Sequence, residues 1–130
     1  MSSNTATSTI TVAAANDAPV LDLNGAGAGS GYSASFTEGD GALAIVGGAI
    51  AISDVDDSNI ETATITLTNA QSGDVLAAGA MPAGITASVV GNVVTLSGSA
   101  SLASYQSAIQ AITFQNAGEN PVAGARTITV

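Results

Sequence analysis

The stretch that decides the fold is Glu61-Thr62-Ala63-Thr64-Ile65-Thr66-Leu67-Thr68, in which threonine alternates with apolar or small residues. Alternation with a period of two is typical of a β-strand that has one face on a core and the other in water. We therefore expect Ala63, Ile65 and Leu67 to face the core. The residues expected to face water are Thr62, Thr64, Thr66 and Thr68.

Shorter strand-like runs, separated by turn-forming residues, continue on both sides of this stretch. Gly91-Asn92 lies between the apolar runs 85–90 and 93–96 and predicts a two-residue hairpin. Further strands are expected at residues 20–23, 32–37, 43–52 (with Gly47-Gly48 as a bulge or kink), 71–81, 113–116 and 125–130. Many short strands of this kind predict an all-β fold, an antiparallel β-sandwich.

One segment breaks the β rhythm. Within residues 99–112, apolar side chains recur at helical spacing, and a serine precedes them as a plausible N-cap. The apolar positions are Leu102, Tyr105, Ile109 and Ile112, and the candidate caps are Ser99 and Ser101. We expect one short helix packed against the edge of the sandwich.

The composition narrows the range of functions. The chain has 130 residues, enough for one domain, and its ten acidic residues against one basic residue give a net charge of -9. Nucleic acids and anionic membrane surfaces are excluded as partners, because binding either requires Lys and Arg. Cys and His are absent, which removes thiolate chemistry, the commonest general base and the commonest zinc ligand. Cations are the natural partners of such a surface.

A candidate cation site lies in the loop that carries Asp54, Asp56 and Asp57. In an extended loop, Asp54 and Asp56 are expected on one side, with Asp57 turned away. Three close carboxylates are expected to raise one another's pKa unless a cation neutralises them. Ca²⁺ takes six to eight oxygen ligands, and Asp17 and Asn16 are placed to supply more. The alternative is a solvated acidic loop without an ion.

Glu38 and Asp40 form a second acidic pair. A paired acid and base of the glycosidase type is one interpretation, but there is almost no aromatic platform for a sugar, and we expect no enzyme. A second cation site at the opposite end of the domain is the better interpretation. Asp74 and Glu119 are expected to be solvated loop charges.

The two ends of the chain hold similar strand patterns. Residues 1–12 contain an alternating stretch, residues 13–19 form a linker in which Ala18-Pro19 favours extended backbone, and residues 20–130 form the sandwich. The chain stops inside the second pattern, so the sandwich is expected to lack its own last strand. The residues expected at the resulting contact are Thr5, Thr7, Ile10 and Val12 on one side and Thr127, Ile128 and Val130 on the other.

Three arrangements can satisfy this pattern. In the first, residues 4–12 fold back beside residues 125–130 of the same chain, at the cost of the 20–23 strand. In the second, they complete the sheet of another copy, a head-to-tail contact that does not close and so builds a filament. In the third, the chain is a monomeric fragment of a tandem-repeat protein with a loose tail.

Segments spread over nearly the whole chain resemble one known family. They are Asn16-Asp17-Ala18-Pro19-Val20, Phe36-Thr37-Glu38-Gly39, Ile52-Ser53-Asp54-Val55-Asp56-Asp57, Ala63-Thr64-Ile65-Thr66-Leu67-Thr68-Asn69, Tyr105-Gln106 through Ile112-Thr113-Phe114, and Arg126-Thr127-Ile128-Thr129-Val130. Together they are similar to the cadherin-like tandem repeats of large secreted bacterial adhesins and biofilm proteins, which type I systems often export.

The resemblance implies a non-enzymatic, calcium-stiffened module of Ig/cadherin-like fold, extracellular or on the cell surface and strung head to tail. Asp17 resembles the linker aspartate of the family, and Asp54 and Asp56 resemble its Asp-x-Asp ligand loop. Glu38 resembles the strand-A glutamate. The fuller family linker, with an additional Asp and Asn, is absent, which leaves the number of ions open. In such repeats a strand like residues 3–10 follows Arg-Thr-Ile-Thr-Val, so residues 1–12 correspond to the last strand of a preceding repeat.

A module from the same type of adhesin that binds carbohydrate or ice is the alternative function. It would need a flat binding face, and the only candidate is the row of threonines from Thr62 to Thr68.

Overall fold

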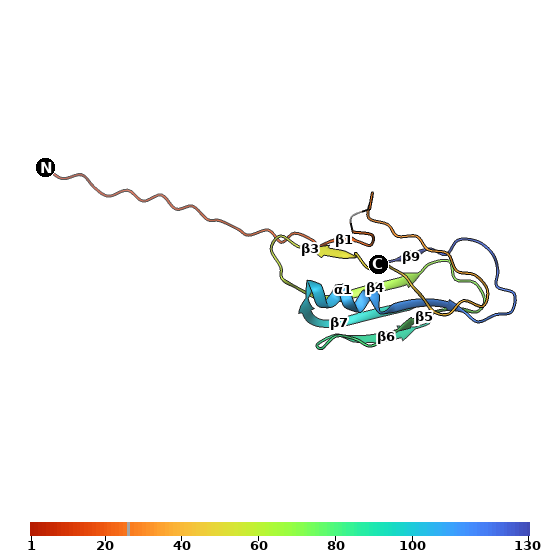
Figure 1. Ribbon diagram of the computed structural model, residues 1–130. Coiled ribbons are helices and arrows are strands. Elements are labelled where there is room, and N and C mark those ends of the chain that lie inside the picture. The colour runs from red at the N-terminus through yellow and green to blue at the C-terminus, as the bar shows by residue number, and fades with distance from the viewer. Residues whose placement is uncertain (26) are drawn as a thin grey trace.

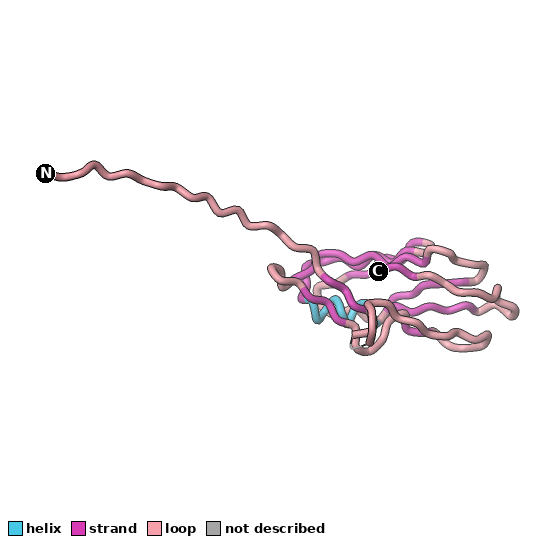
Figure 2. Tube along the Cα trace, turned by 90° about the horizontal axis from the view of Figure 1, so that it is seen from above, coloured by secondary structure: helices cyan, strands magenta, loops and turns pink. Residues whose placement is uncertain are grey.

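The computed structural model describes residues 1–25 and 27–130. In these residues a mostly β body carries an extended N-terminal arm (residues 1–15), which points away from the body (Figures 1 and 2). Antiparallel sheets and one short helix confirm the coarse fold prediction. The elements are β1 (Val20–Asp22), β2 (Leu43–Ala44), β3 (Ala51–Ser53), β4 (Asn59–Leu67), β5 (Asp74–Ala78), β6 (Thr86–Val90), β7 (Val93–Ser101), α1 (Leu102–Gln110), β8 (Ile112–Asn116) and β9 (Ile128–Thr129).

The longest strands form an antiparallel sheet in the order β6-β7-β4-β9. β4 is the alternating threonine strand, and its burial follows the prediction except at Thr66, which is half-buried. Ile65 and Leu67 are buried, whereas Thr62 and Thr64 are exposed. The predicted hairpin is also present, because β6 and β7 pair up to the turn at Gly91-Asn92, where Gly91 has φ 58°.

The core lies between this sheet, a second sheet in the order β2-β8-β5, and the helix. One cluster of buried side chains joins them. It includes Ile65, Val94 and Leu96 from the first sheet, Leu76, Ile112 and Phe114 from the second, and Tyr105, Ala108 and Ile109 from α1.

The helix links the core to the loop that carries the aspartates. Ser101 is its N-cap, accepting a 3.1 Å hydrogen bond from the Ser104 N–H group. Tyr105 is fully buried on the inner face. On the same helix, the Gln106 side chain accepts a 2.9 Å hydrogen bond from the Ile52 N–H group. The helix thereby fixes β3, the strand that leads into Asp54.

The expectation of one strand region over residues 43–52 is wrong. β2 pairs with β8 and β3 pairs with β1, so the chain changes sheets between them. Ile50 N–H bonds to the Gly47 carbonyl at 3.3 Å, and the side chains of Val46 and Ile50 are buried inside this bend. Gly47-Gly48 therefore belongs to a corner rather than to a bulge within one strand.

Two other expected strands are largely unpaired. In the described part of the chain, residues 32–36 belong to no sheet, and pairing within residues 125–130 is limited to β9 and the Thr127 carbonyl, which accepts a 2.9 Å hydrogen bond from Thr68 N–H. In the described part of the chain, no helix is long and apolar enough to span a membrane.

Candidate functional site

The N-terminal arm is free of the body. Every residue from 1 to 20 is exposed, with Ile10 and Val12 at 84% and 88% of their maximal exposure. In the described part of the chain, no hydrogen bond joins residues 1–15 to the body, and the arm runs outward in both views (Figures 1 and 2). The structure therefore does not show the self-closed arrangement. It leaves two apolar, β-branched side chains in water on a strand-like segment.

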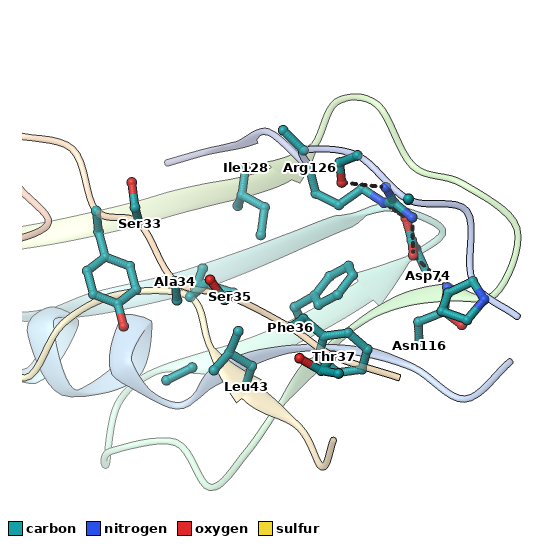
Figure 3. Close-up of a pocket in the computed structure, with 18 of the residues that line it drawn as sticks. Ser33, Ala34, Ser35, Phe36, Thr37, Leu43, Asp74, Asn116, Arg126 and Ile128 are labelled. Atoms are coloured by element: carbon teal, nitrogen blue, oxygen red, sulfur yellow. Dashed lines mark hydrogen bonds and ion pairs between the residues drawn. The ribbon is translucent and has the colours of Figure 1, made fainter. Parts of the chain in front are cut away.

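A cleft of about 710 Å³ lies on the body between residues 32–38 and residues 121–130; we call it the groove (Figure 3). Its apolar lining includes Phe36, Phe114 and Ile128. The rings of Phe36 and Phe114 meet edge to face, with centroids 5.4 Å apart. The acceptor residues predicted from sequence fall here, because Ile128 and Val130 line the groove and Thr127 belongs to the same segment.

Both walls of the groove present unpaired backbone. β9 bonds to β4 through Thr129 and Ile128, and no described strand pairs with its other side. Across the groove, residues 32–36 make no backbone hydrogen bond among the described residues; the first contact is from Thr37 N–H to the Asp40 carboxylate, at 2.7 Å. Open strand edges of this kind are templates for pairing with another strand.

An ion pair that the sequence did not reveal fixes one end of the groove. Asp74 was expected to be solvated, but its side chain is fully inaccessible and bonds to the Arg126 guanidinium (Figure 3). Asn116 donates to the same carboxylate at 2.8 Å. Arg126 also donates to the Val122 and Gly124 carbonyls, at 2.7 and 2.9 Å. The single cationic side chain thus binds the β9 wall to β5.

A side-chain clamp holds the same wall against β4. Asn69 accepts a 2.7 Å hydrogen bond from Thr127 N–H and donates a 2.9 Å bond to the Ala125 carbonyl. The segment that carries the open edge is therefore positioned before anything binds to it.

The pKa of Asp74 lies below its ordinary value of 3.8, although burial by itself would raise it, because the Arg126 hydrogen bond and those from Gln71 N–H and Asn116 outweigh desolvation. A carboxyl whose pKa is lowered by folding stabilises the fold above its unfolded pKa, and that contribution disappears as pH falls through the folded pKa.

We therefore expect acid to weaken the fold partly through Asp74. Urea unfolding of the wild-type chain should show a free energy of unfolding that falls as pH drops below 3.8. The Asp74→Asn variant should show a smaller fall over the same range, because it has no proton to gain at this position. Parallel pH profiles for the two proteins would contradict this role.

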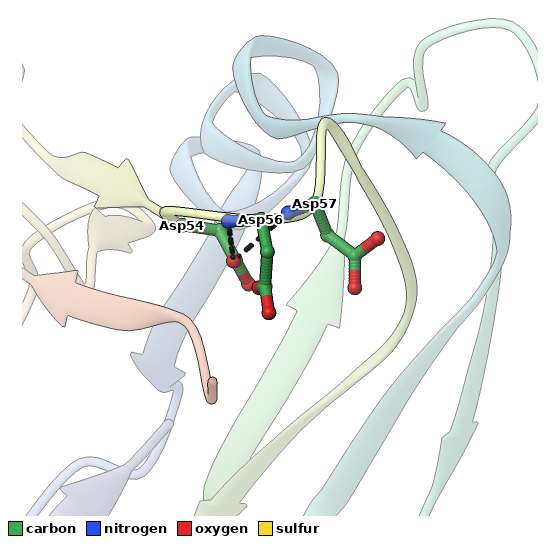
Figure 4. A group of neighbouring side chains, drawn as sticks. All are labelled: Asp54, Asp56 and Asp57. Atoms are coloured by element: carbon green, nitrogen blue, oxygen red, sulfur yellow. Dashed lines mark hydrogen bonds between the residues drawn. The ribbon is translucent and has the colours of Figure 1, made fainter. Parts of the chain in front are cut away.

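The acidic loop follows directly after β3. Asp54 Oδ1 accepts hydrogen bonds from the N–H groups of Asp56 and Asp57, at 3.1 and 3.0 Å, so the side chain folds the chain into a tight turn (Figure 4). In this turn one carboxylate oxygen from each of the three aspartates lies within 4.8 Å of the others. The expectation that Asp57 turns away is therefore wrong, because the loop is a turn and not an extended segment.

The same hydrogen bonds correct the expected titration. The N–H groups of Asp56 and Asp57 hold the pKa of Asp54 below its ordinary value, in place of the increase expected from carboxylate repulsion alone. Asp54 is thus ionised over the pH range in which a cation would bind.

The linker reaches this loop through its backbone. Asp17 N–H donates to Asp56 Oδ2 at 2.9 Å, and the Asn16 side chain donates to the Asp17 carbonyl. The Asp17 carboxylate is not part of the three-carboxylate group. Three of the residues predicted to bind metal therefore come together: Asp54, Asp56 and Asp57. Asp17 contacts this group through its main-chain N–H. The Asn16 side chain instead bonds to the neighbouring Asp17 carbonyl.

Glu38 lies elsewhere. It lines a shallow pocket of about 250 Å³ with Asp40 and Glu119. Glu38 lies in the turn before β2. Because β2 runs antiparallel to β8, this turn lies at the C-terminal end of β8, away from α1. The Asp54 loop lies elsewhere, between β3 and the start of β4 (Figure 1). Within one chain Glu38 therefore does not join the Asp54 group.

The chemistry of the acidic loop fits a hard cation. Its carboxylate oxygens are clustered and largely exposed, and each carboxylate retains an oxygen that can face a metal. The group could hold an ion such as Ca²⁺, with water or further oxygens completing the shell.

The row of threonines on β4 is less regular than a flat binding face requires. Thr62 and Thr68 donate their hydroxyls to the Leu96 and Thr127 carbonyls, at 3.0 and 3.1 Å, and Thr66 is half-buried. This arrangement does not favour carbohydrate or ice binding there.

Comparison with known proteins adds no assignment: no family model, curated protein or solved structure matches the chain.

Proposed function

We propose that this protein is a non-enzymatic structural module, an Ig/cadherin-like β-sandwich that assembles head to tail by donating residues 4–12 to a second copy. The observation that carries the proposal is a complementarity within one chain. The arm offers a strand with Ile10 and Val12 in water, and the body offers an apolar groove beside the unpaired edge of β9.

Charge supports the second copy as the partner. The molecule has a net charge of -9, so two bodies repel each other, but residues 1–15 contain no charged side chain. At the groove, Asp74 is neutralised by Arg126, and Glu38 is the other acidic residue in the lining. The arm can therefore approach another copy without bringing acidic side chains to it.

The energetics also favour such a contact. Full burial of a Val or Ile side chain contributes about 1.5 to 3 kcal/mol, so Ile10 and Val12 together supply a hydrophobic anchor for a strand ladder. Because the donor and acceptor surfaces are different, the contact is heterologous and each added copy presents a new groove or a new arm. The product is a linear filament or adhesin stalk, with an extracellular or cell-surface location.

Calcium has a defined place in this scheme. A Ca²⁺ ion held by Asp54, Asp56 and Asp57 would offset most of the negative charge of the turn to which the linker is bonded through Asp17 N–H. The linker would then leave the body in a fixed direction, which stiffens each junction.

Deletion of residues 1–12 tests the assembly. The arm makes no described hydrogen bond with the body, so the deleted protein keeps its fold. By sedimentation velocity we expect the full chain to form concentration-dependent oligomers and the deleted protein to stay monomeric. Added to the full chain, the deleted protein should shorten the oligomers, because it can accept a strand but cannot donate one. A full chain that remains monomeric at high concentration would identify the arm as a loose tail and end the proposal.

The calcium site has a separate test. Ca²⁺ should raise the Tm of the deleted protein, since a ligand present at about 100 times its Kd adds about 2.7 kcal/mol to the free energy of unfolding. The Asp54→Asn/Asp56→Asn variant should lose this shift, and Glu119→Gln, which removes a remote charge, should keep it. A Tm that does not change with Ca²⁺ would contradict the calcium site without contradicting strand donation.

A further inference from the structure

We infer that the donated strand inserts between two strand edges of the second copy, β9 on one side and residues 32–36 on the other, so that it is paired along both sides. This inference rests on the proposed function and specifies its binding site. It differs from simple addition to the outer edge of a sheet, for which β5 and β6 offer edges of their own.

The first observation in support is that both walls of the groove have unpaired backbone groups. Residues 32–36 are already extended, yet their backbone groups are unpaired in the described structure, and they face β9 across the same groove (Figure 3). Residues 32–35 are exposed, so their backbone N–H and C=O groups are free to exchange water for the groups of an added strand. A strand in the groove supplies partners to both walls at once, which no strand added to β5 or β6 can do.

Length and direction follow from the chain path. Residues 32–37 span about 20 Å at 3.3 Å per residue, and residues 5–12 are long enough to run the length of that wall. The Tyr32 end of the groove adjoins β1 through Leu23, and the acceptor's own linker leaves from β1. The donor's body must therefore lie at the opposite end, beyond Thr37. The inserted strand then runs parallel to residues 32–36 and antiparallel to β9.

The same direction sets the register of side chains. Alternation turns Ala6, Ser8, Ile10 and Val12 inward, so the small residues enter first and the two large ones come last. In the inferred direction, Ile10 and Val12 lie toward the Phe36 and Phe114 end of the groove. The outward positions of the donor are Thr5, Thr7, Thr9 and Thr11.

Disulfide trapping tests the two-sided contact, because the chain has no cysteine of its own. The donor is the full chain with Thr9→Cys. Each acceptor lacks residues 1–12 and carries one cysteine at an exposed position. Ser35→Cys probes the wall formed by residues 32–36. Thr127→Cys and Thr129→Cys probe the β9 wall in two alternative registers. Val75→Cys and Ser88→Cys probe the outer edges of β5 and β6. Directly opposed residues on neighbouring strands have Cα atoms about 4.5 to 5.5 Å apart, within the range of about 4.4 to 6.8 Å that a disulfide spans.

We expect disulfide-linked heterodimers with Ser35→Cys and with one of the two β9-wall variants, and only background with the β5 and β6 variants. Trapping on the β9 wall alone, or on β5 or β6, would overturn the two-sided insertion while leaving head-to-tail donation intact. Absence of any heterodimer, together with a monomeric full chain in sedimentation, would instead remove the proposed function itself.

Discussion

The double substitution Ile10→Asp/Val12→Asp is expected to abolish assembly. Both side chains are almost fully exposed in the free chain and become buried in the proposed contact. Loss of their burial removes at least about 3 kcal/mol, more than a hundredfold in Kd, and two carboxylates without partners in an apolar groove weaken binding further. Analytical ultracentrifugation over a concentration series measures the change.

The matched control places the same two charges on the other face of the strand. Thr9→Asp/Thr11→Asp leaves the inward side chains in place, so this variant should retain most of the assembly at moderate ionic strength, where the added repulsion is screened. If both double variants assemble equally well, the arm does not enter an apolar site. Neither variant should change the Tm of the monomer, because residues 1–15 make no described hydrogen bond with the body.

Replacement of Asp74 by Asn is expected to lower the free energy of unfolding by about 3 to 5 kcal/mol. The Asp74 side chain is inaccessible and that of Arg126 is only 13% exposed, so the substitution leaves a largely buried guanidinium without its counter-charge. Urea unfolding of the protein without residues 1–12 gives the value free of any contribution from assembly.

Two further variants separate the ion pair from a general loss of charge. Glu119→Gln removes an exposed carboxylate and should change the free energy of unfolding by less than about 0.5 kcal/mol. Asp74→Leu/Arg126→Met removes both charges and should cost less than Asp74→Asn, since an unpaired buried charge is worse than none. If the loss of stability in the double variant equals the sum of the losses in Asp74→Leu and Arg126→Met measured alone, the two residues act independently.

The sequence predicted best those elements whose signals are local. The alternation in β4, the turn at Gly91-Asn92 and the capped helix at Ser101 each depend on neighbours a few residues apart, and all three are present. The acidic loop was located correctly for the same reason.

Most of the errors concern contacts between residues far apart in the sequence, whereas the misplacement of Asp57 is a local error. Asp74 and Arg126 are 52 positions apart, so nothing near Asp74 marks it as a buried partner. The change of sheet within residues 43–52 depends on which strands lie beside each half. Asp57 was misplaced because the Asp54 side chain folds the loop into a turn. The groove itself was not predicted, because its two walls are separated by most of the chain.

Electron microscopy of the 130-residue chain at high concentration, with calcium present, tests the central claim most directly. Negative-stain images should show unbranched filaments of single-module width, and these should be absent from the protein that lacks residues 1–12. A field of separate monomers from the full chain would contradict head-to-tail donation of the arm.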